Sequence, residues 1–510
     1  MTSTPNTTQD QQKFNQELTY IAKNSGIGGS GILIGNIINY ATNILITRTV
    51  GAEYYGLFYL GTNIVGLMNL VWSFGFYSGV LKFVSLYAGQ NDYSRVKGVL
   101  SFALKYILAA SCFALVVIYL GANYTSYGIF DKPKLEIALK ILAFAMPFTM
   151  ITALYLSTLQ GLRLIKYNVL VTNVFSPLSK LVLLGVFFIS GIYYIGLMLA
   201  FTIASLLTCL LAVYFLTRSL RVHQYKPIFD NKNDFFKFSR PIYFQQFFNF
   251  AVTSLPVYFL SYFHSSGDTG IYGIGLSLSI MVSLSLRASN MIFAPTISML
   301  YGKGEKATLE QLFKVITKWI FTLAFFVFLV IILFATPILQ IFGEDFIRGK
   351  TAIYLIVLGE LVNAGVGAVG FMLMMTGRPQ INLLNSVVLF FVTLTGCYFL
   401  IPTYGLVGAG LTVAISTTLL NLLSLLQVYY YERIHPYNIK FLKPLAAGIL
   451  AFIIVSVMKS YLPVLDIISS GVLLIIFVIL FAINIWVLKL DENDKLIFDN
   501  IMKKLKLKSI

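Results

Sequence analysis

Three charged side chains lie in stretches where a chain of this composition has little reason to keep a charge. Arg287 sits in LSLSIMVSLSLRASNMIFAPTISML (276–300), which is otherwise uncharged and long enough to cross a bilayer. Lys180 and Glu360 are likewise embedded in apolar runs. Because a charge at the bilayer centre costs about 3 kcal/mol on insertion scales, such residues usually form ion pairs or carry function.

The types of these residues indicate a site for an anion. Arg287 and Lys180 can attract a negatively charged group and donate hydrogen bonds to it, so we predict that both face a hydrated cavity. The alternatives are a buried ion pair or a side chain that extends to the membrane surface. Lys82 and Arg48 lie at the ends of apolar runs and are candidates for the same cavity, although each is explained equally well as a helix-end charge. Glu360 either pairs with one of the two cations or binds a coupling proton or cation.

The composition places these residues in a membrane protein. Of the 510 residues, 58% are hydrophobic and 11% charged, whereas a soluble domain carries about 25% charged residues. The polar first 25 residues and the length of the first apolar run argue against a cleaved signal peptide. We therefore expect a multi-pass, all-α protein of the bacterial cytoplasmic (inner) membrane.

Runs of roughly 20 apolar residues predict the spanning helices. We count fourteen, and their approximate limits are 26–48, 57–80, 100–121, 137–159, 168–190, 195–217, 240–263, 271–299, 315–336, 352–375, 381–401, 406–430, 442–461 and 466–488.

Lys and Arg in the connecting segments predict the orientation. If the N-terminus is cytoplasmic, 28 of the 37 Lys and Arg lie in or next to cytoplasmic segments and 7 lie outside. This asymmetry predicts that both termini are cytoplasmic. It also means that the net charge of +17 mainly sets topology and contacts anionic lipid, rather than binding nucleic acid.

The two halves of the chain resemble each other. Tyr55-Gly56 recurs as Tyr272-Gly273, Gly161 as Gly377 and Gly196 as Gly408, at offsets of 217, 216 and 212 residues. Six helices per half imply a pseudo-twofold axis along the membrane normal and a central cavity of the kind transporters use. The predicted parts are a cytoplasmic tail (1–25), an N-lobe (26–217), a cytoplasmic linker (218–239), a C-lobe (240–430), two further helices (431–488) and a basic cytoplasmic tail (489–510).

Two glycine-rich stretches and the cysteines carry no chemistry of their own. GIGGSG (26–31) fits a dinucleotide fingerprint but has no preceding strand, and GEDFIRGKT (343–351) has five residues between its glycines, where a phosphate loop has four. Cys112, Cys209 and Cys397 lie in apolar runs without metal-ligand spacing, so we predict neither a disulfide framework nor a metal site.

Several motifs together resemble the polysaccharide-export branch of the multidrug/oligosaccharidyl-lipid/polysaccharide (MOP) flippase superfamily. They occur in the same order and at similar spacing over roughly residues 24 to 430. They are ITRTVGAEYYGLFYL (46–60), FGFYSGVLKFVSLYAGQND (74–92), LSTLQGLRLIKYN (156–168), KFSRPIYFQQF (237–247), GDTGIYGIGLSLSI (267–280), FAPTISMLYGKGE (293–305) and TGRPQ (376–380).

The resemblance implies a non-enzymatic flippase with two six-helix lobes around a cationic cavity. Its substrate would be an undecaprenyl-pyrophosphate-linked oligosaccharide, such as an O-antigen, capsule or exopolysaccharide repeat unit, which alternating access moves to the outer leaflet. It needs no cofactor beyond a proton or sodium gradient, and its partners would be membrane lipids and the polysaccharide polymerase and chain-length proteins.

Two other classes of function stay open: another exporter of the superfamily, for drugs or for the peptidoglycan lipid precursor, and an enzyme such as a polymerase or ligase. A drug–cation antiporter of the superfamily typically has an acid in the first helix, where this chain has Asn36, Asn39 and Asn43. A flippase for the peptidoglycan lipid precursor would favour a basic cluster early in the first two helices. A polysaccharide polymerase or ligase usually has a large outer loop, and the outer loops predicted here are short.

Overall fold

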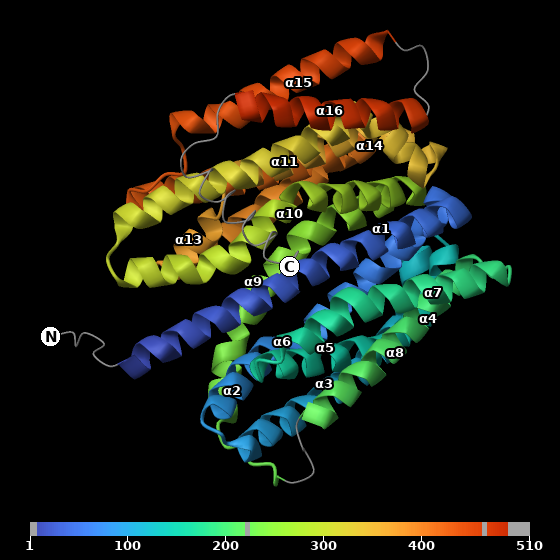
Figure 1. Ribbon diagram of the computed structural model, residues 1–510. Coiled ribbons are helices and arrows are strands. Elements are labelled where there is room, and N and C mark those ends of the chain that lie inside the picture. The colour runs from blue at the N-terminus through green and yellow to red at the C-terminus, as the bar shows by residue number, and fades with distance from the viewer. Residues whose placement is uncertain (1–7, 220–224, 462–466, 488–510) are drawn as a thin grey trace, which may run out of the picture. The chain divides into compact units, whose positions relative to one another are not determined.

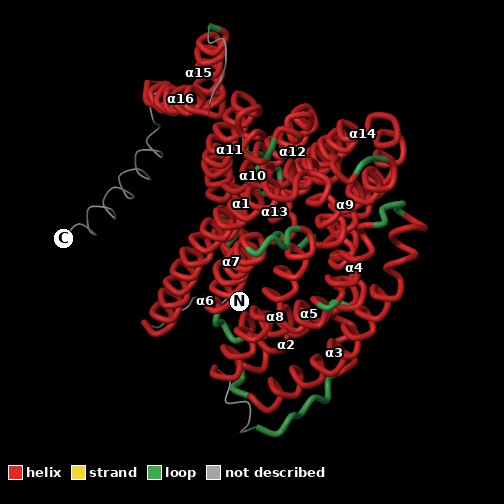
Figure 2. The backbone as a smooth tube through the Cα atoms, turned by 90° about the vertical axis from the view of Figure 1, so that its right-hand side faces the viewer, coloured by secondary structure: helices red, strands yellow, loops and turns green. Residues whose placement is uncertain are grey.

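The computed structural model describes residues 8–219, 225–461 and 467–487, and the predicted basic tail 489–510 lies outside this part. The described chain is helical, with turns and loops but no strand (Figure 2). It contains ten helices long and apolar enough to cross a membrane, or eleven if one bent pair counts as a span. An all-helical fold is what a bilayer requires, because a helix satisfies its backbone hydrogen bonds internally.

The described helices occupy most of the chain, and Figure 1 shows their arrangement. In order they are α1 (Thr8–Ser73), α2 (Phe76–Gly89), α3 (Tyr93–Asn123), η1 (Tyr124–Ile129), α4 (Lys134–Ala143), α5 (Ala145–Gly161), α6 (Ile165–Val169), η2 (Leu170–Phe175), α7 (Ser176–Ile189), α8 (Tyr194–Ser219), α9 (Lys232–Phe263), α10 (Ser266–Gly302), α11 (Lys306–Phe342), η4 (Glu344–Gly349), α12 (Lys350–Val366), α13 (Val369–Met375), α14 (Pro379–Glu432), η5 (Ile439–Phe441), α15 (Leu442–Ser460) and α16 (Ile467–Val487).

The number fourteen stays a prediction, and the backbone shows why the counts differ. Two of the candidate spans, Ser30–Ser73 and Pro379–Glu432, are 44 and 54 residues long, about twice what one crossing needs. Each bends at a glycine with positive φ, Gly51 (φ 77°) and Gly405 (φ 53°), between two predicted spans. In addition, α9 covers the predicted span 240–263 but is not among the helices that are apolar enough.

Other predicted boundaries differ from the structure. Helix α1 begins at Thr8, within the predicted cytoplasmic tail 1–25, whose bounds stay a prediction. The predicted span 57–80 is interrupted at Phe74 and Gly75, both with positive φ (47° and 73°). Within the predicted span 352–375, Gly367 (φ 71°) separates α12 from α13.

The described chain forms two compact units. The first contains Met1–Ile274 and Ser386–Ala409, and the second contains Gly275–Asn385 and Gly410–Ile510. The lobe boundaries at 217, 239 and 430 are therefore kept as predictions. In the second unit α15 and α16 pack against each other and against α11 (Figure 1), through buried side chains that include Phe325, Phe477 and Val455.

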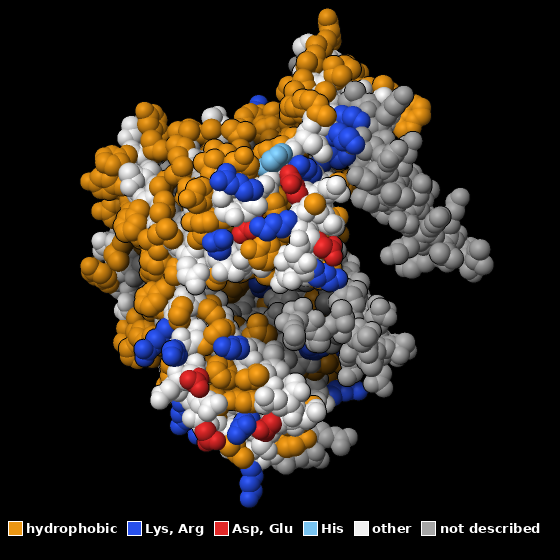
Figure 3. Space-filling model, turned by 90° about the vertical axis from the view of Figure 1, so that its left-hand side faces the viewer, with side chains coloured by type: hydrophobic (Ala, Val, Ile, Leu, Met, Phe, Trp, Pro, Cys, Tyr) orange, Lys and Arg blue, Asp and Glu red, His pale blue; other side chains and the backbone are white. Residues whose placement is uncertain are grey.

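The surface matches the class of protein that the composition predicts. Figure 3 shows a face on which hydrophobic side chains cover broad areas, with Lys and Arg side chains in clusters between them. Exposed apolar side chains on this scale are typical of a surface that contacts lipid.

The described end of the predicted linker 218–239 is attached to the first unit. Lys97 Nζ donates to the carbonyl oxygen of Tyr225 at 2.6 Å, and the amide of Ile228 donates to the Ser94 carbonyl at 3.2 Å. A methyl group on Gly98 would overlap the carbonyl of Ile228, so only glycine allows this approach. The segment therefore packs on the start of α3 before α9 begins.

Three segments far apart in sequence meet around the end of α9, all within the first unit. Lys132 Nζ donates to the carbonyl oxygens of Ser261 (2.5 Å) and His264 (3.1 Å). A cation in this position satisfies carbonyls that the helix leaves unpaired. Burial lowers the pKa of Lys132, while nearby carboxylates oppose the shift. His264 Nε2 lies 2.8 Å from the carbonyl oxygen of Ile401, which extends the contact to α14.

Beside this meeting point α1 and α10 approach closely at two glycines. A methyl group on Gly56 would overlap the carbonyl oxygen of Ser266, and one on Gly270 would overlap that of Ala52. The glycines predicted as landmarks of an internal repeat thus include one whose lack of a side chain is a packing requirement.

We expect the substitution Gly56→Ala to destabilise the protein by about 1–3 kcal/mol, because the added methyl group forces the two helices apart. Thermal unfolding of the detergent-solubilised protein, followed by intrinsic fluorescence, measures the effect as a lower midpoint.

Gly121→Ala is the matched control, since Gly121 is also helical and a methyl group there has open space around it. Its midpoint should stay level or rise slightly, because alanine is the better helix former. Equal midpoints for the two variants would contradict a packing role for Gly56.

Candidate functional site

Lys180 is positioned by an irregular stretch of backbone. The π-helical turn η2 precedes α7, and Pro177 occupies the first turn of α7. Such turns often occur at functional sites because they change the direction of the side chains that follow. Lys180 lies well inside the candidate span Ile165–Ile189, so its ammonium group cannot easily reach either end of that span.

The Lys180 side chain lines a small cavity inside the first unit. The cavity has a volume of about 160 Å³ and is walled by both arms of α1, by α7 and by α8. We call it the Lys180 pocket; its lining residues are Asn39, Thr42, Asn43, Ile46, Phe58, Thr62, Lys180, Leu184, Leu197 and Phe201. Its volume is below the 300–1,000 Å³ typical of pockets for drug-sized ligands, so it suits a single small group.

The electrostatics of the Lys180 pocket favour an anion. Lys180 Nζ lies 4.7 Å from the ring centroid of Phe201, a cation–π contact, and none of the described residues that line the pocket is acidic. Thr42 and Thr62 donate their hydroxyl hydrogens to backbone carbonyls at 2.7 and 2.9 Å, which fixes both side chains. A positive charge without a carboxylate partner at membrane depth is costly, and an anionic ligand would offset that cost.

Arg287, the second predicted cavity residue, lies on α10 in the second unit. Its side chain is exposed, and its Nε lies 3.4 Å from Ser283 Oγ one turn earlier. This bond leaves most of the guanidinium donors available to an anionic group. Lys180 and Arg287 belong to different units, so the shared cavity predicted for them stays a prediction.

Glu360 and Arg287 do not form the predicted ion pair in the described part of the second unit. Glu360 is half-buried on α12 and accepts a hydrogen bond from Asn363 Nδ2 at 3.0 Å. Its partner is thus an amide of the same helix, and the carboxylate keeps further capacity to accept hydrogen bonds or to bind a cation.

The two helix-end cations have different surroundings. Lys82 is exposed on α2, and its Nζ lies 3.8 Å from the ring centroid of Phe238 on α9. This contact anchors the side chain in the first unit, and Lys82 lies in the middle of α2 rather than at the helix end that the apolar run predicted. Arg48 is exposed on α1, three residues before the bend at Gly51. The structure does not bring Lys82 or Arg48 into the lining of the Lys180 pocket.

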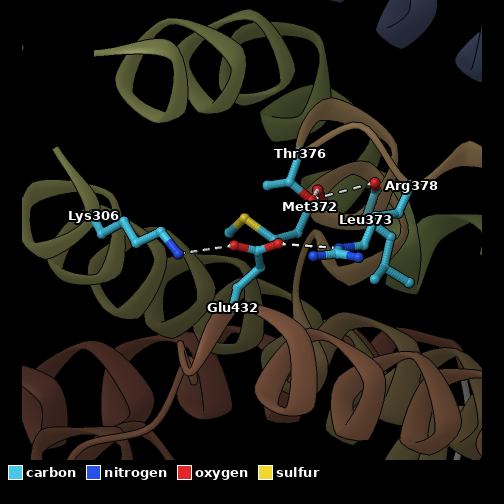
Figure 4. A network of polar contacts seen from close by, with 6 residues as sticks. All are labelled: Lys306, Met372, Leu373, Thr376, Arg378 and Glu432. Carbon is cyan, nitrogen blue, oxygen red and sulfur yellow. Dashed lines mark hydrogen bonds and ion pairs between the residues drawn. The ribbon is translucent and has the colours of Figure 1, made fainter. Parts of the chain in front are cut away.

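The second unit contains a buried carboxylate that the sequence analysis did not single out. Glu432, at the end of α14, has a side chain only 1% exposed and lies between Lys306 Nζ (3.2 Å) and Arg378 Nε (3.3 Å). Figure 4 shows the two cations approaching the carboxylate from opposite sides. Because Glu432 lies in the short connection after the predicted run 406–430, its sequence position suggested an ordinary surface residue.

This ion-paired cluster also fixes the turn that carries Arg378. Thr376 Oγ1 donates to the carbonyl oxygen of Met372 at 2.9 Å, which closes the end of α13 (Figure 4). The guanidinium of Arg378 in addition lies 4.3 Å from the ring centroid of Tyr431. Removing the carboxylate would leave two cations close together, so we interpret the cluster as structural.

Comparison with known proteins identifies similar sequences and similar structures. A family model described as "Polysaccharide biosynthesis protein" matches residues 21–301. Among curated proteins, the capsular polysaccharide biosynthesis protein CapF of Staphylococcus aureus is 28% identical over 186 residues. That alignment covers 36% of this chain and 46% of CapF, so the chain spans about half the length of this curated relative.

Solved structures share the fold over most of the chain. The lipid II flippase MurJ in an inward closed conformation has a TM-score of 0.70 at 15% identity, covering 90% of this chain and 97% of MurJ. A multidrug resistance MATE family transporter of the MOP superfamily, in an inward-facing conformation, has a TM-score of 0.68 at 15% identity. It covers 80% of this chain and 98% of its own. At this identity the likeness concerns the fold alone.

We predict that Lys180→Met abolishes anion binding in the Lys180 pocket while the protein stays folded. Thermal unfolding with and without inorganic pyrophosphate tests this, since a ligand at 100 times its Kd stabilises by about 2.7 kcal/mol. The wild-type midpoint should rise with pyrophosphate and that of Lys180→Met should not. Without the ligand the variant should be at least as stable as wild type, because an unpaired charge is removed.

Lys105→Met controls for the loss of one positive charge, since Lys105 is an exposed residue of α3 that does not line the pocket. It should keep the wild-type response. A pyrophosphate response that persists in Lys180→Met, or disappears in both variants, would show that the pocket is not the anion site.

Proposed function

The chain belongs to the family of polysaccharide biosynthesis proteins, and on that premise we propose that it moves a lipid-linked oligosaccharide from the cytoplasmic to the outer leaflet. It is a multi-pass bacterial membrane protein with the fold of MOP-type transporters. Family and fold are those of transporters rather than enzymes. The substrate we propose is an undecaprenyl-pyrophosphate-linked repeat unit of a surface polysaccharide.

The observation that carries this proposal is the acid-free Lys180 pocket. A transporter of cationic drugs needs negative charge where its substrate or coupling ion binds, whereas the described lining of this pocket contains Lys180 and neutral residues. A pyrophosphate carries about two negative charges that lysine and arginine attract through charge-assisted hydrogen bonds. The sign of the charge thus favours the lipid-linked pyrophosphate over a cationic drug.

The proposed mechanism divides the substrate between two environments. The pyrophosphate and sugars would occupy hydrated, positively charged parts of the protein, while the acyl chain would stay in lipid throughout. In each conformation the headgroup would be open to one side of the membrane only, as in other transporters built from repeated lobes. We propose that Arg287 and Lys180 contact the pyrophosphate or an acidic sugar, with Lys82 and Arg48 as weaker candidates.

We expect Arg287→Ala to abolish export and Arg287→Lys to restore part of it, because lysine keeps the charge but not the planar pair of hydrogen bonds. Complementation of a strain that lacks the flippase measures this as surface polysaccharide at matched protein levels. An exposed charge replaced by alanine should leave folding intact. Wild-type polysaccharide from Arg287→Ala would refute a substrate role for this residue.

The deletion strain also separates transport from polymerisation. Single lipid-linked units should accumulate, and mass spectrometry identifies them, but a missing polymerase gives the same result. The sidedness of that pool decides between them: the units should be inaccessible from the outer face of the membrane. Accumulation in the outer leaflet would instead indicate a polymerase or ligase.

Glu360 is the residue we propose for binding a coupling proton or cation, because in the described part of the second unit its carboxylate accepts from Asn363 and does not pair with Arg287. Glu360→Gln keeps a group that can accept from Asn363 but cannot titrate. In proteoliposomes with labelled substrate, the variant should lose the stimulation of transport by a proton or sodium gradient. Glu344→Gln, at an exposed acid outside the helix interiors, should keep it. Equal stimulation in the two variants would exclude Glu360 from coupling.

A further inference from the structure

The first unit contains a second and larger pocket, at the ends of its helices. Its volume is about 620 Å³, and its walls come from the bend of α1, the start of α4 and the turn between α7 and α8. We call it the tyrosine pocket; its lining residues are Thr49, Val50, Tyr54, Lys134, Ile137, Gly191, Ile192, Tyr193, Tyr194 and Ile195. This volume lies within the range typical of pockets for small organic ligands.

The charged group in the tyrosine pocket is already neutralised. Lys134 Nζ lies 3.4 Å from Glu53 Oε1 and 3.0 Å from the hydroxyl oxygen of Tyr54. The lysine and glutamate side chains are 52% and 62% exposed, so both also remain open to a ligand. The pair has no net charge and therefore does not attract an anion as Lys180 does. It offers donors and acceptors side by side, which suits a neutral ligand with many hydroxyl groups.

Of the tyrosines that line the pocket, two are held in place by contacts and a third is exposed. The rings of Tyr54 and Tyr194 lie 4.7 Å apart, and the hydroxyl of Tyr194 donates to the Lys134 carbonyl at 2.9 Å, which holds this wall in place. The neighbouring Tyr193 is 52% exposed. An exposed ring of this kind can pack against the apolar C–H face of a sugar, while adjacent polar groups bind its hydroxyls.

We propose that the tyrosine pocket binds sugar residues of the transported oligosaccharide, separately from the pyrophosphate. This inference rests on the proposed function, which supplies a glycan as the substrate class. In the predicted orientation the pocket opens on the outer side of the membrane, so it would hold the glycan after translocation. A phospholipid headgroup is the less suitable occupant, because the Lys134–Glu53 pair leaves no net positive charge for its phosphate.

Binding of the free sugar tests the proposal without the lipid and the pyrophosphate. The probe is the repeat-unit oligosaccharide of the host's surface polysaccharide, released from its carrier by mild acid. Saturation-transfer NMR measures its binding to the full-length protein in zwitterionic nanodiscs. Tyr193→Ala should weaken binding about tenfold, and Tyr193→Phe, which keeps the ring, should stay within about twofold of wild type.

Tyr124→Ala is the matched control, because Tyr124 is a 71% exposed tyrosine in the first unit that does not line the pocket. It should bind the probe as wild type does. The proposal is overturned if the wild type does not bind the probe, if Tyr193→Ala binds it normally, or if both alanine variants weaken it equally. Loss of binding when anionic lipid replaces the zwitterionic lipid would assign the pocket to lipid headgroups instead.

The same variants separate this inference from the proposed function. If the wild type transports the lipid-linked unit but Tyr193→Ala binds the free sugar normally, the sugar site is contradicted and the flippase function is supported. If Tyr193 is required for sugar binding but the wild type shows no transport, the sugar site is supported and the flippase function is contradicted.

Discussion

A bilayer supplies no hydrogen-bond partners in its core, so the protein itself must provide one for every polar group placed there. The helical backbone meets this demand along the described chain, and at the end of α9 it is met by Lys132, which binds the final carbonyl groups. Lys180 instead contacts the ring of Phe201, and the described lining of its pocket contains neutral polar side chains but no carboxylate. The charge of Lys180 is therefore only partly compensated by the protein, and this is the physical basis for an anion site.

The two pockets of the first unit divide the chemistry of one substrate class. The Lys180 pocket is small, with positive charge and no acid in its described lining, whereas the tyrosine pocket is larger and has a neutral ion pair at its edge. A lipid-linked oligosaccharide has a compact anionic part and an extended uncharged part. Matching each part to a different pocket gives specificity for the combination, since neither a simple phosphate nor a free sugar fills both.

Much of the fold could be predicted from the sequence, because the length of an apolar run and the position of a charge within it can be read from neighbouring residues alone. The all-helical membrane fold, which MOP transporters share, and the membership of the polysaccharide biosynthesis family are confirmed, and Lys180 was recognisable as a cation within an apolar run. Its contact with Phe201 was not, since the two residues lie on different helices. The interruptions at Phe74 and Gly367 depend on tertiary packing that a hydropathy pattern does not contain.

The burial of Glu432 has a consequence for ionic strength. Added salt screens exposed charges beyond about 10 Å at 0.1 M and weakens surface ion pairs, but it acts much less on a buried group. Because the Glu432 carboxylate is 1% exposed, its pairs with Lys306 and Arg378, whose side chains are 54% and 37% exposed, should weaken less in concentrated salt than the attraction of fully exposed Lys and Arg to anionic lipids. Rising salt concentration would thus release bound anionic lipids from this unit before it weakens the ion pairs inside the unit.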